Sequence, residues 1–581
     1  MSYLRLDDPN KIEPFKAEVE RLAHGQHVAV ISTGAIQTVK VQRGFRVETT
    51  ALAIVGVLIA LTFLVVAAQG LTRQALTEAG DHPTLRALGM GPRQLRAVTL
   101  VRCLAIALPA AASACIIAVA LSPHMLLGLA RKADLHPGIH PDGLVLALGA
   151  LATIAGITIT GVVVGRLASR RALPVTGERD RPRRSLLAAV TRGVALPPAT
   201  AVGMRFALRR DRSAPGVPIW TTVVGAALTV ALLVGTWSFT ASLRQLINTP
   251  HLYGWNWDLR VGAPALPDIG GVIVPALQKN PEVSGLSAGT VTQALVHQQR
   301  IDLLTVQPVE GVVTPTFVAG RPPVNSKEIA LGARTMRSWN VKLDDHVTVR
   351  IGDASQPFRV VGRAVFPEFG DAGQLGTGAY VTLGGLDRLL RSLSTNNQFT
   401  GAPRNVFFIK FRPGTNLNAA RARISAALDP LPHRVEGHPA DLANLERVSA
   451  LPELFSAILM ALAVVLLVHT LVTSIRRRRR ELAVLEAMGF VRQQVRMCVV
   501  THSVTLVVIS LLIGIPLGIG AGRGAWKIFA SELGVVSGPV VPMALVIAAV
   551  VAAIVVAVLA ALLPAWLATR RNPATPLRTA E

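Results

Sequence analysis

The chain has 581 residues, of which 51% are hydrophobic and 16% are charged. This composition is too apolar for an ordinary soluble protein of this length and predicts a protein that lies in a lipid bilayer. The formal net charge is +25, but the arginines lie mostly beside apolar runs and without base-stacking aromatic residues, so nucleic acid is excluded as a predicted partner. All three cysteines fall inside apolar runs, which predicts no disulfide framework: Cys103, Cys115 and Cys498.

Apolar stretches long enough to cross a bilayer as a helix of about 20 residues recur along the chain. Backbone polar groups in lipid must be satisfied within the segment, so we interpret each stretch as a transmembrane helix. We predict about seven spans by this criterion, at 51–69, 97–121, 143–167, 219–240, 454–474, 497–521 and 541–568.

Short loops rich in Lys and Arg remain in the cytoplasm, and this rule gives the orientation. Four basic segments alternate correctly with the spans: 70–96, 168–218, the region that begins with Arg476 to Arg480, and the C-terminal tail. We therefore predict a multi-pass protein of the cell membrane with its N-terminus outside, its C-terminus in the cytoplasm and a large outside domain at 241–450. For most of these arginines, anchoring to anionic headgroups is a sufficient explanation.

An internal repeat relates two parts of the chain at an offset of 400 residues. Residues 85–90 (LRALGM) align with 485–490 (LEAMGF), and 167–171 (LASRR) align with 567–571 (LATRR). Agreement at both ends predicts a three-span unit that occurs twice.

The repeat also bears on the N-terminus, where residues 3–6 resemble 408–411 at a slightly larger offset. Residues 1–47 then correspond to the last part of an outside domain. By this comparison a leading span and most of a first outside domain are missing before Met1, and we expect an upstream-encoded segment or a neighbouring gene to supply them.

The order of one span, a large outside domain and three spans, with the charged segment Arg480 to Phe490 (RELAVLEAMGF), resembles the FtsX-like permeases of the MacB type. These are the membrane subunits of ABC transporters. The resemblance implies an α-helical polytopic membrane protein of two repeated three-helix units with an α+β extracytoplasmic domain. It implies the divisions 1–47 (domain remnant), 51–171 (first unit), 172–218 (basic cytoplasmic linker), 219–240 (span), 241–450 (domain), 454–571 (second unit) and 572–581 (tail).

In that family, a short cytoplasmic helix between the first two spans of each unit docks on a separate ATP-binding cassette ATPase. The resemblance implies docking residues Glu481, Leu482, Leu485, Glu486, Met488 and Gly489 in the second copy, and Leu85, Ala87 and Gly89 in the first. The first copy departs from the pattern at Asp81 to Thr84. Residues 481–488 form an amphipathic helix by periodicity alone, and Gly489 would end it. A membrane-surface helix without a protein partner is the alternative.

Enzyme chemistry has no visible signature in the sequence. No Gly-Lys dipeptide occurs, so the phosphate-binding loop of an ATPase is absent and a partner subunit must bind the ATP. Metalloprotease, zinc and serine-hydrolase motifs are missing as well, so we predict no catalytic residue, no metal and no cofactor bound by this chain.

Ionisable residues inside the apolar runs are candidates for a proton relay, because charge is costly in hydrocarbon. Arg102 and His502 are repeat equivalents near the cytoplasmic edge, where a side chain can reach the interface, and His469 is the third such residue. Their positions favour anchoring or helix packing. An ion- or proton-coupled secondary transporter, which also uses duplicated halves, is the alternative function.

Small residues at four-residue spacing predict a close helix-packing seam in the span 497–521. They are Gly514, Gly518 and Gly522, and the first unit has Ala114, Ala118 and Ser122 at the equivalent positions. Pro516 lies among the glycines and predicts a kink. In the outside domain, Trp255 and Trp257 are expected to serve interfacial anchoring or core packing rather than ligand stacking.

Overall fold

The computed structural model describes residues 82–125, 141–171, 197–208, 219–262, 268–296, 299–311, 313–367, 375–392, 401–428, 435–436, 450–477 and 479–569, with Glu18 and scattered positions between 53 and 71. The predicted domain remnant 1–47, the predicted span 51–69 and the tail 572–581 lie wholly or mostly outside these residues. The described residues form two compact units. One contains Leu246–Leu445 and Phe529–Ser537, and the other contains Ala51–Gln245, Glu446–Ile528 and Gly538–Glu581.

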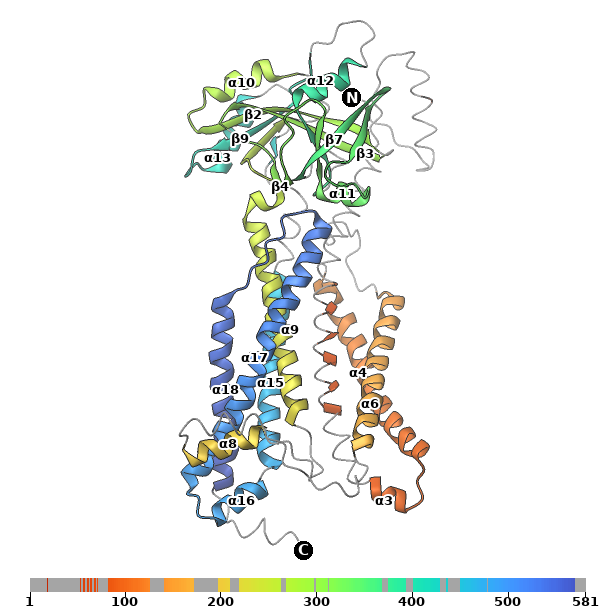
Figure 1. The fold of residues 1–581 in the computed structure, drawn as a ribbon, viewed down its shortest axis with the longest axis vertical. Helices are drawn as coiled ribbons and strands as arrows, with labels where there is room; N and C mark the ends of the chain where they lie inside the picture. The colour runs from red at the N-terminus through yellow and green to blue at the C-terminus, as the bar shows by residue number, and fades with distance from the viewer. Residues whose placement is uncertain are drawn as a thin grey trace. The chain divides into compact units, whose positions relative to one another are not determined.

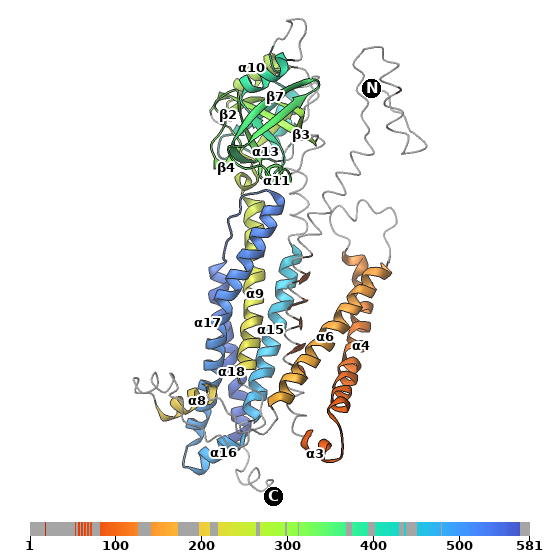
Figure 2. The same ribbon diagram turned by 45° about the vertical axis from the view of Figure 1, so that its right-hand side comes forward.

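The compact unit that contains Ala51–Gln245, Glu446–Ile528 and Gly538–Glu581 consists of helices (Figure 1). The long helices are α4 (Pro92–Met125), α6 (Gly143–Arg171), α9 (Ile219–Asn248), α15 (Ala450–Arg477), α17 (Arg492–Leu533) and α18 (Met543–Thr569). The short ones are α3 (His82–Ala87), α8 (Pro198–Leu208) and α16 (Arg479–Ala487). In both views α4 and α6 lie side by side, and Figure 2 separates α15 from α9.

Five helices among the described residues are long and apolar enough to cross a membrane. Their apolar parts are Ala97–Ser122, Gly143–Val163, Val223–Asn248, Arg492–Leu533 and Met543–Leu562. The predicted span 454–474 corresponds to α15, whose shorter apolar part is Ser456–His469. The predicted total of about seven spans is therefore not confirmed.

Two boundaries in this unit differ from the prediction. The predicted span 497–521 is shorter than the helix that contains it, because α17 continues through Pro516 to Leu533 and no further proline interrupts it before Gly534, which has a φ of 74°. We expected 172–218 to be a basic linker throughout, but it contains α8. This helix buries Ala199 and Ala207, so it is packed against other residues although arginines flank it in the sequence.

The compact unit that contains Leu246–Leu445 and Phe529–Ser537 is an α+β domain built on one sheet of ten strands (Figures 1 and 2). The strands are β1 (Leu259–Gly262), β2 (Val283–Val296), β3 (Gln299–Glu310), β4 (Thr316–Gly320), β5 (Glu328–Gly332), β6 (His346–Ile351), β7 (Ala354–Val365), β8 (Ala379–Val381), β9 (Val406–Phe411) and β10 (Val435–Glu436). Their order is β10-β1-β9-β2-β3-β8-β5-β7-β4, and β6 pairs with β2 and β7. The pairs β3–β8 and β5–β7 are parallel, and the other pairs are antiparallel.

The helices of this domain are the 3-10 helix η2 (Pro250–Tyr253), α10 (Gly270–Gln278), α11 (Ala333–Ser338), α12 (Leu383–Arg391) and α13 (Leu417–Ala427). Side-chain caps begin two of them: Thr382 accepts a hydrogen bond from the Gly385 N–H, and Asn416 accepts one from the Ala419 N–H. One apolar core lies between α10, α13 and the strands β1, β2 and β9, and a second lies around β5 to β8 with α11 and α12.

Trp255 and Trp257 lie in the core of this domain, since each side chain is 3% exposed. The two rings have centroids 5.0 Å apart, and Trp257 lies 4.3 Å from Phe408 of β9. Of the two roles expected from the sequence, core packing is the one that this geometry shows.

Candidate functional site

The segment from α16 to the start of α17 forms a helix, a tight turn and a second helix. Gly489 ends α16 with a φ of 95°, a backbone conformation that glycine adopts without strain. The Phe490 N–H donates to the Leu485 carbonyl at 3.1 Å, and the Gly489 N–H donates to the Glu486 carbonyl at 3.0 Å. At the start of α17, the Gln494 side chain accepts a hydrogen bond from the Val491 N–H at 3.1 Å. Backbone and side chain together therefore fix the turn.

Leu485 attaches this turn to the rest of the helical unit. Its side chain is 7% exposed and packs in a cluster with Val495, Cys498 and Val499 of α17 and Ala561 of α18. Partly buried residues of α8, Val202 and Phe206, complete the cluster. We expected Leu485 to dock a partner, but this burial makes it a residue that positions the turn.

The same helix and turn also expose apolar side chains. Met488 is 65% exposed, Val491 59% and Val484 45%, and Glu481 and Ala487 are exposed beside them. Glu486 is half-buried, Gly489 is exposed, and the Leu482 side chain lies outside the described residues. Sequence reasoning missed Val484 and Val491, although both lie close to the proposed docking residues.

The first copy repeats this turn in α3 and the start of α4. Gly89 has a φ of 92°, the Met90 N–H donates to the Leu85 carbonyl at 3.1 Å, and the Gln94 side chain accepts from the Gly91 N–H at 2.9 Å. Ala87 and Gly89 are exposed, Leu85 is half-buried, and Leu88, at the position equivalent to Met488, is 78% exposed. The local conformation is thus duplicated, although α3 is the shorter helix.

A close seam joins α9 and α17, which lie side by side in Figures 1 and 2. A Cβ added to Gly514 would lie 2.5 Å from the Ala227 carbonyl oxygen, one added to Gly518 2.5 Å from that of Ala231, and one added to Gly522 2.7 Å from that of Gly235. The Ser510 hydroxyl donates to the Val223 carbonyl at 3.4 Å one turn earlier. The structure therefore brings the three predicted glycines together on one helix face.

The three equivalent positions on α4 are not buried by the residues that the structure describes. Ala114 and Ala118 are exposed, and Ser122 is half-buried. The repeat equivalents His502 and Arg102 also differ in burial. His502 of α17 is 3% exposed, whereas Arg102 of α4 is exposed. His469 of α15 is also exposed.

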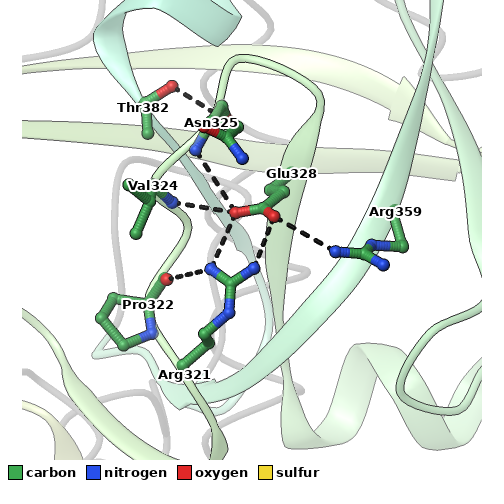
Figure 3. Close-up of polar contacts among 7 residues, drawn as sticks. All are labelled: Arg321, Pro322, Val324, Asn325, Glu328, Arg359 and Thr382. Carbon is green, nitrogen blue, oxygen red and sulfur yellow. Dashed lines mark hydrogen bonds and ion pairs between the residues drawn. The ribbon is translucent and has the colours of Figure 1, made fainter.

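The domain contains a buried carboxylate, Glu328 at the start of β5 (Figure 3). Arg321 donates two hydrogen bonds to it at 2.5 and 2.9 Å, and Arg359 lies 3.3 Å away on β7. The backbone N–H groups of Val324 and Asn325 donate to the same carboxylate. These hydrogen bonds hold the pKa of Glu328 well below its usual range, with the Arg321 hydrogen bond as the largest cause. The contacts tie the loop after β4 to β5 and β5 to β7, which is a structural role.

The end of α17 belongs to the same unit as this domain. Arg337 of α11 donates to the Ser531 carbonyl and lies 3.4 Å from the Glu532 carboxylate. A Cβ added to Gly376 would lie 2.7 Å from the Gly534 Cα. The residues Phe529–Ser537 therefore pack into the domain, a contact that hydropathy alone does not indicate.

Two family models match parts of this chain. The family model of the FtsX-like permease C-terminal domain matches residues 50–173 and 453–573, and that of the MacB-like periplasmic core domain matches residues 220–427. No curated protein matches the chain. Among solved structures, the extracellular domain of the noncanonic ABC-type transporter YknZ from Gram-positive bacteria has 13% identity and a TM-score of 0.20, over 31% of this chain and 100% of that chain.

The two family matches place the chain in a class, that of ABC transporter permeases embedded in the membrane. Within that class it belongs to the FtsX-like permeases of the MacB type, with two copies of the permease domain and one described extracytoplasmic domain between them.

The seam predicts a contrast between two glycines of α17. Gly518→Ala places a methyl group against the Ala231 carbonyl, and we expect it to destabilise the protein by about 1–3 kcal/mol through overpacking. Gly520→Ala is the matched control, because nothing lies within 4 Å of its added Cβ. Thermal unfolding of both purified variants in detergent measures the difference, and equal melting temperatures would contradict the seam.

The buried carboxylate predicts a dependence of domain stability on pH. The folded pKa of Glu328 is lowered from 4.5, so its contribution is present above pH 4.5 and is lost as the pH falls below that value. Glu328→Gln should cost about 2 kcal/mol at pH 7 and weaken the acid dependence. Hydrogen exchange of β5 and β7 amides between pH 7 and pH 4 measures both effects. Glu310→Gln, at an exposed carboxylate of the same sheet, should change neither.

Proposed function

We propose that this chain is the permease subunit of an ABC transporter and that a separate ATPase subunit docks on the turn from α16 to α17. The exposed apolar side chains of Val484, Met488 and Val491 carry this proposal, because they lie together on a turn that Leu485 holds in place. Exposed apolar clusters on a folded protein are typical of protein interfaces. The sequence has no phosphate-binding loop, so ATP hydrolysis belongs to the partner.

The docking turn must face the cytoplasm, where ATP is available. The arginines that precede and begin α16, Arg476 to Arg480, support this orientation, and so does the basic segment after α18. The N-terminus is then outside. The first-copy turn offers an equivalent but smaller surface, with Leu88 at its centre, and a second ATPase subunit is its proposed partner.

Binding of the ATPase must be coupled to a conformational change elsewhere in the permease. We propose that a helix running from the docking turn to the extracytoplasmic domain transmits this change. α17 meets this requirement, since it begins at the docking turn and its last residues pack into the extracytoplasmic domain through Arg337 and Gly376. ATP binding and hydrolysis would then change the conformation of that domain. The output is export or extraction of amphipathic cargo, or mechanical signalling to a protein outside the cell.

The docking surface predicts that Met488→Glu abolishes co-purification of the ATPase. A buried charge at an apolar interface costs several kcal/mol, so we expect the bound fraction to fall by about 10-fold or more. Met543→Glu is the matched control, because Met543 is 58% exposed at the start of α18 and Met488 is 65% exposed. Pull-down of the full-length protein with its ATPase, followed by quantitative blotting, measures the change.

Leu485→Ala separates positioning from direct contact. Loss of this buried side chain should lower the stability of the permease by about 2–3 kcal/mol as well as weaken docking, whereas Met488→Glu should weaken docking alone. Normal ATPase binding by Met488→Glu would contradict the proposed surface.

The energy source distinguishes this function from ion-coupled transport. In vesicles with a constant ATP supply, transport activity should persist after an uncoupler removes the proton gradient. ATP hydrolysis that rises on addition of an amphipathic cargo would favour export or extraction, and hydrolysis that rises only on binding of an outside protein would favour signalling. Activity that collapses with the gradient would instead support the secondary transporter.

A further inference from the structure

The two copies of the turn differ in the apolar side chains that they expose. In the second copy, between α16 and α17, three large ones are exposed: Val484, Met488 and Val491. At the offset of 400 residues, the corresponding positions of the first copy have Thr84, Leu88 and Gly91. Leu88 is 78% exposed, but Thr84 has a polar hydroxyl group and Gly91 has no side chain. Burial of apolar surface drives most protein association, so the second turn offers more of that driving force.

The two turns also differ in how firmly the rest of the protein holds them. Leu485 is 7% exposed and packs against residues of α8, α17 and α18, so the second turn is held in place before a partner binds. Leu85, its equivalent in the first turn, is only half-buried. A partner that binds the first turn must therefore order it more, and ordering on binding lowers affinity. Burial of these leucines and exposure of the neighbouring apolar residues are separate observations, and both favour the second turn.

The backbone of the turn is nevertheless the same in both copies. Gly89 and Gly489 have φ angles of 92° and 95°, and each ends the helix before the turn. The side chains of Gln94 and Gln494 each accept a hydrogen bond from the backbone N–H three residues earlier. A partner surface shaped for one turn therefore fits the other as well. The difference between the copies is one of affinity rather than of the kind of partner.

We propose that the two turns bind two copies of the same ATPase with unequal affinity, so that the turn from α16 to α17 is occupied first and the turn from α3 to α4 fills only at a higher ATPase concentration. This inference rests on the proposed docking of an ATPase at these turns. Burial of a half-exposed valine strengthens binding by roughly 5-fold. Val484 and Val491 together should therefore make the second turn at least about 10-fold tighter. The supply of ATPase then determines whether one or two subunits are bound.

A titration with the ATPase measures the two affinities. The probe is the ATPase that co-purifies with the full-length wild-type chain, expressed and purified separately. It is added in increasing amounts to the full-length chain in detergent, without nucleotide so that turnover does not disturb the equilibrium. Native mass spectrometry counts the ATPase subunits bound per chain at each concentration. We expect two successive binding steps whose midpoints differ at least about 10-fold in ATPase concentration.

Single substitutions assign each step to a turn. Met488→Glu should remove the step at low ATPase concentration and leave the other, because it places a charge in the tighter interface. Leu88→Glu should remove the step at high concentration and leave the tighter one. Met543→Glu, at an exposed methionine of α18, is the control and should change neither step. The melting temperature of each variant confirms that it is folded.

A gain of affinity tests the cause of the difference. The double variant Thr84→Val with Gly91→Val gives the first turn the valines of the second. Gly91 accepts a side chain without strain, because its φ is not positive and its added Cβ would meet only the Gln94 Oε1, at 3.9 Å. We expect the weaker midpoint to move toward the tighter one by at least about 5-fold. Thr84→Ser with Gly91→Ala adds no large apolar side chain, and this control should leave the midpoint unchanged.

Three results would overturn the inference and leave ATPase docking at Met488 intact. They are two subunits that bind with equal midpoints, a single bound subunit at saturation, and unequal midpoints that the double valine variant does not bring closer. If neither Met488→Glu nor Leu88→Glu changed either step, the proposed docking itself would be wrong and the inference would fail with it. Failure of the inference alone is thus distinguishable from failure of the proposed function.

Discussion

The close approach of α9 and α17 constrains how two of the long described helices pack. Three glycines face three backbone carbonyls at four-residue spacing, so a shift by one residue would push Ile515, Leu517 or Ile519 toward a carbonyl. Only shifts of a whole four-residue step, about 6 Å, preserve the pattern. The register of α17 against α9 is therefore fixed.

The two copies of the turn, at Gly89 and at Gly489, show which features depend on local sequence and which depend on long-range packing. Gly89 and Gly489 have nearly the same φ, and Gln94 and Gln494 make the same capping hydrogen bond, although α3 is short and α16 longer. Local sequence is thus sufficient for the turn. Burial of the equivalent leucines differs, because Leu485 has α8 and α17 around it, whereas Leu85 is only half-buried. Packing partners, rather than the turn itself, determine how firmly each copy is held.

Hydropathy located the five long apolar helices that the described residues contain, because hydropathy is a property of a sequence window, but the predicted total of about seven spans is not confirmed. The α+β character of the domain was also predicted, but its strand order was not, since pairs such as β3–β8 join segments far apart in the chain. The same limit applies to the candidate site. The motif indicated a helix that ends at Gly489, which the structure contains, yet it did not distinguish buried Leu485 from exposed Met488, because that depends on α8 and α18. Glu328 gave no sequence signal, since its two arginines come from a loop and a different strand.

The helix α8 shows which signal was overlooked. Arginines on both sides made 172–218 resemble a basic linker, but Ala199, Gly203 and Ala207 recur at four-residue spacing within it. Gly203 lies directly against α17, where an added Cβ would be 2.5 Å from the Cys498 carbonyl oxygen. Small residues at this spacing therefore mark a contact face on α8, on α9 and on α17. On α8 the pattern identifies a packed helix that average hydropathy misses, and on α4 the same pattern lies exposed. The spacing is thus a better guide to where helices meet than hydropathy is, because it reports how closely two backbones approach.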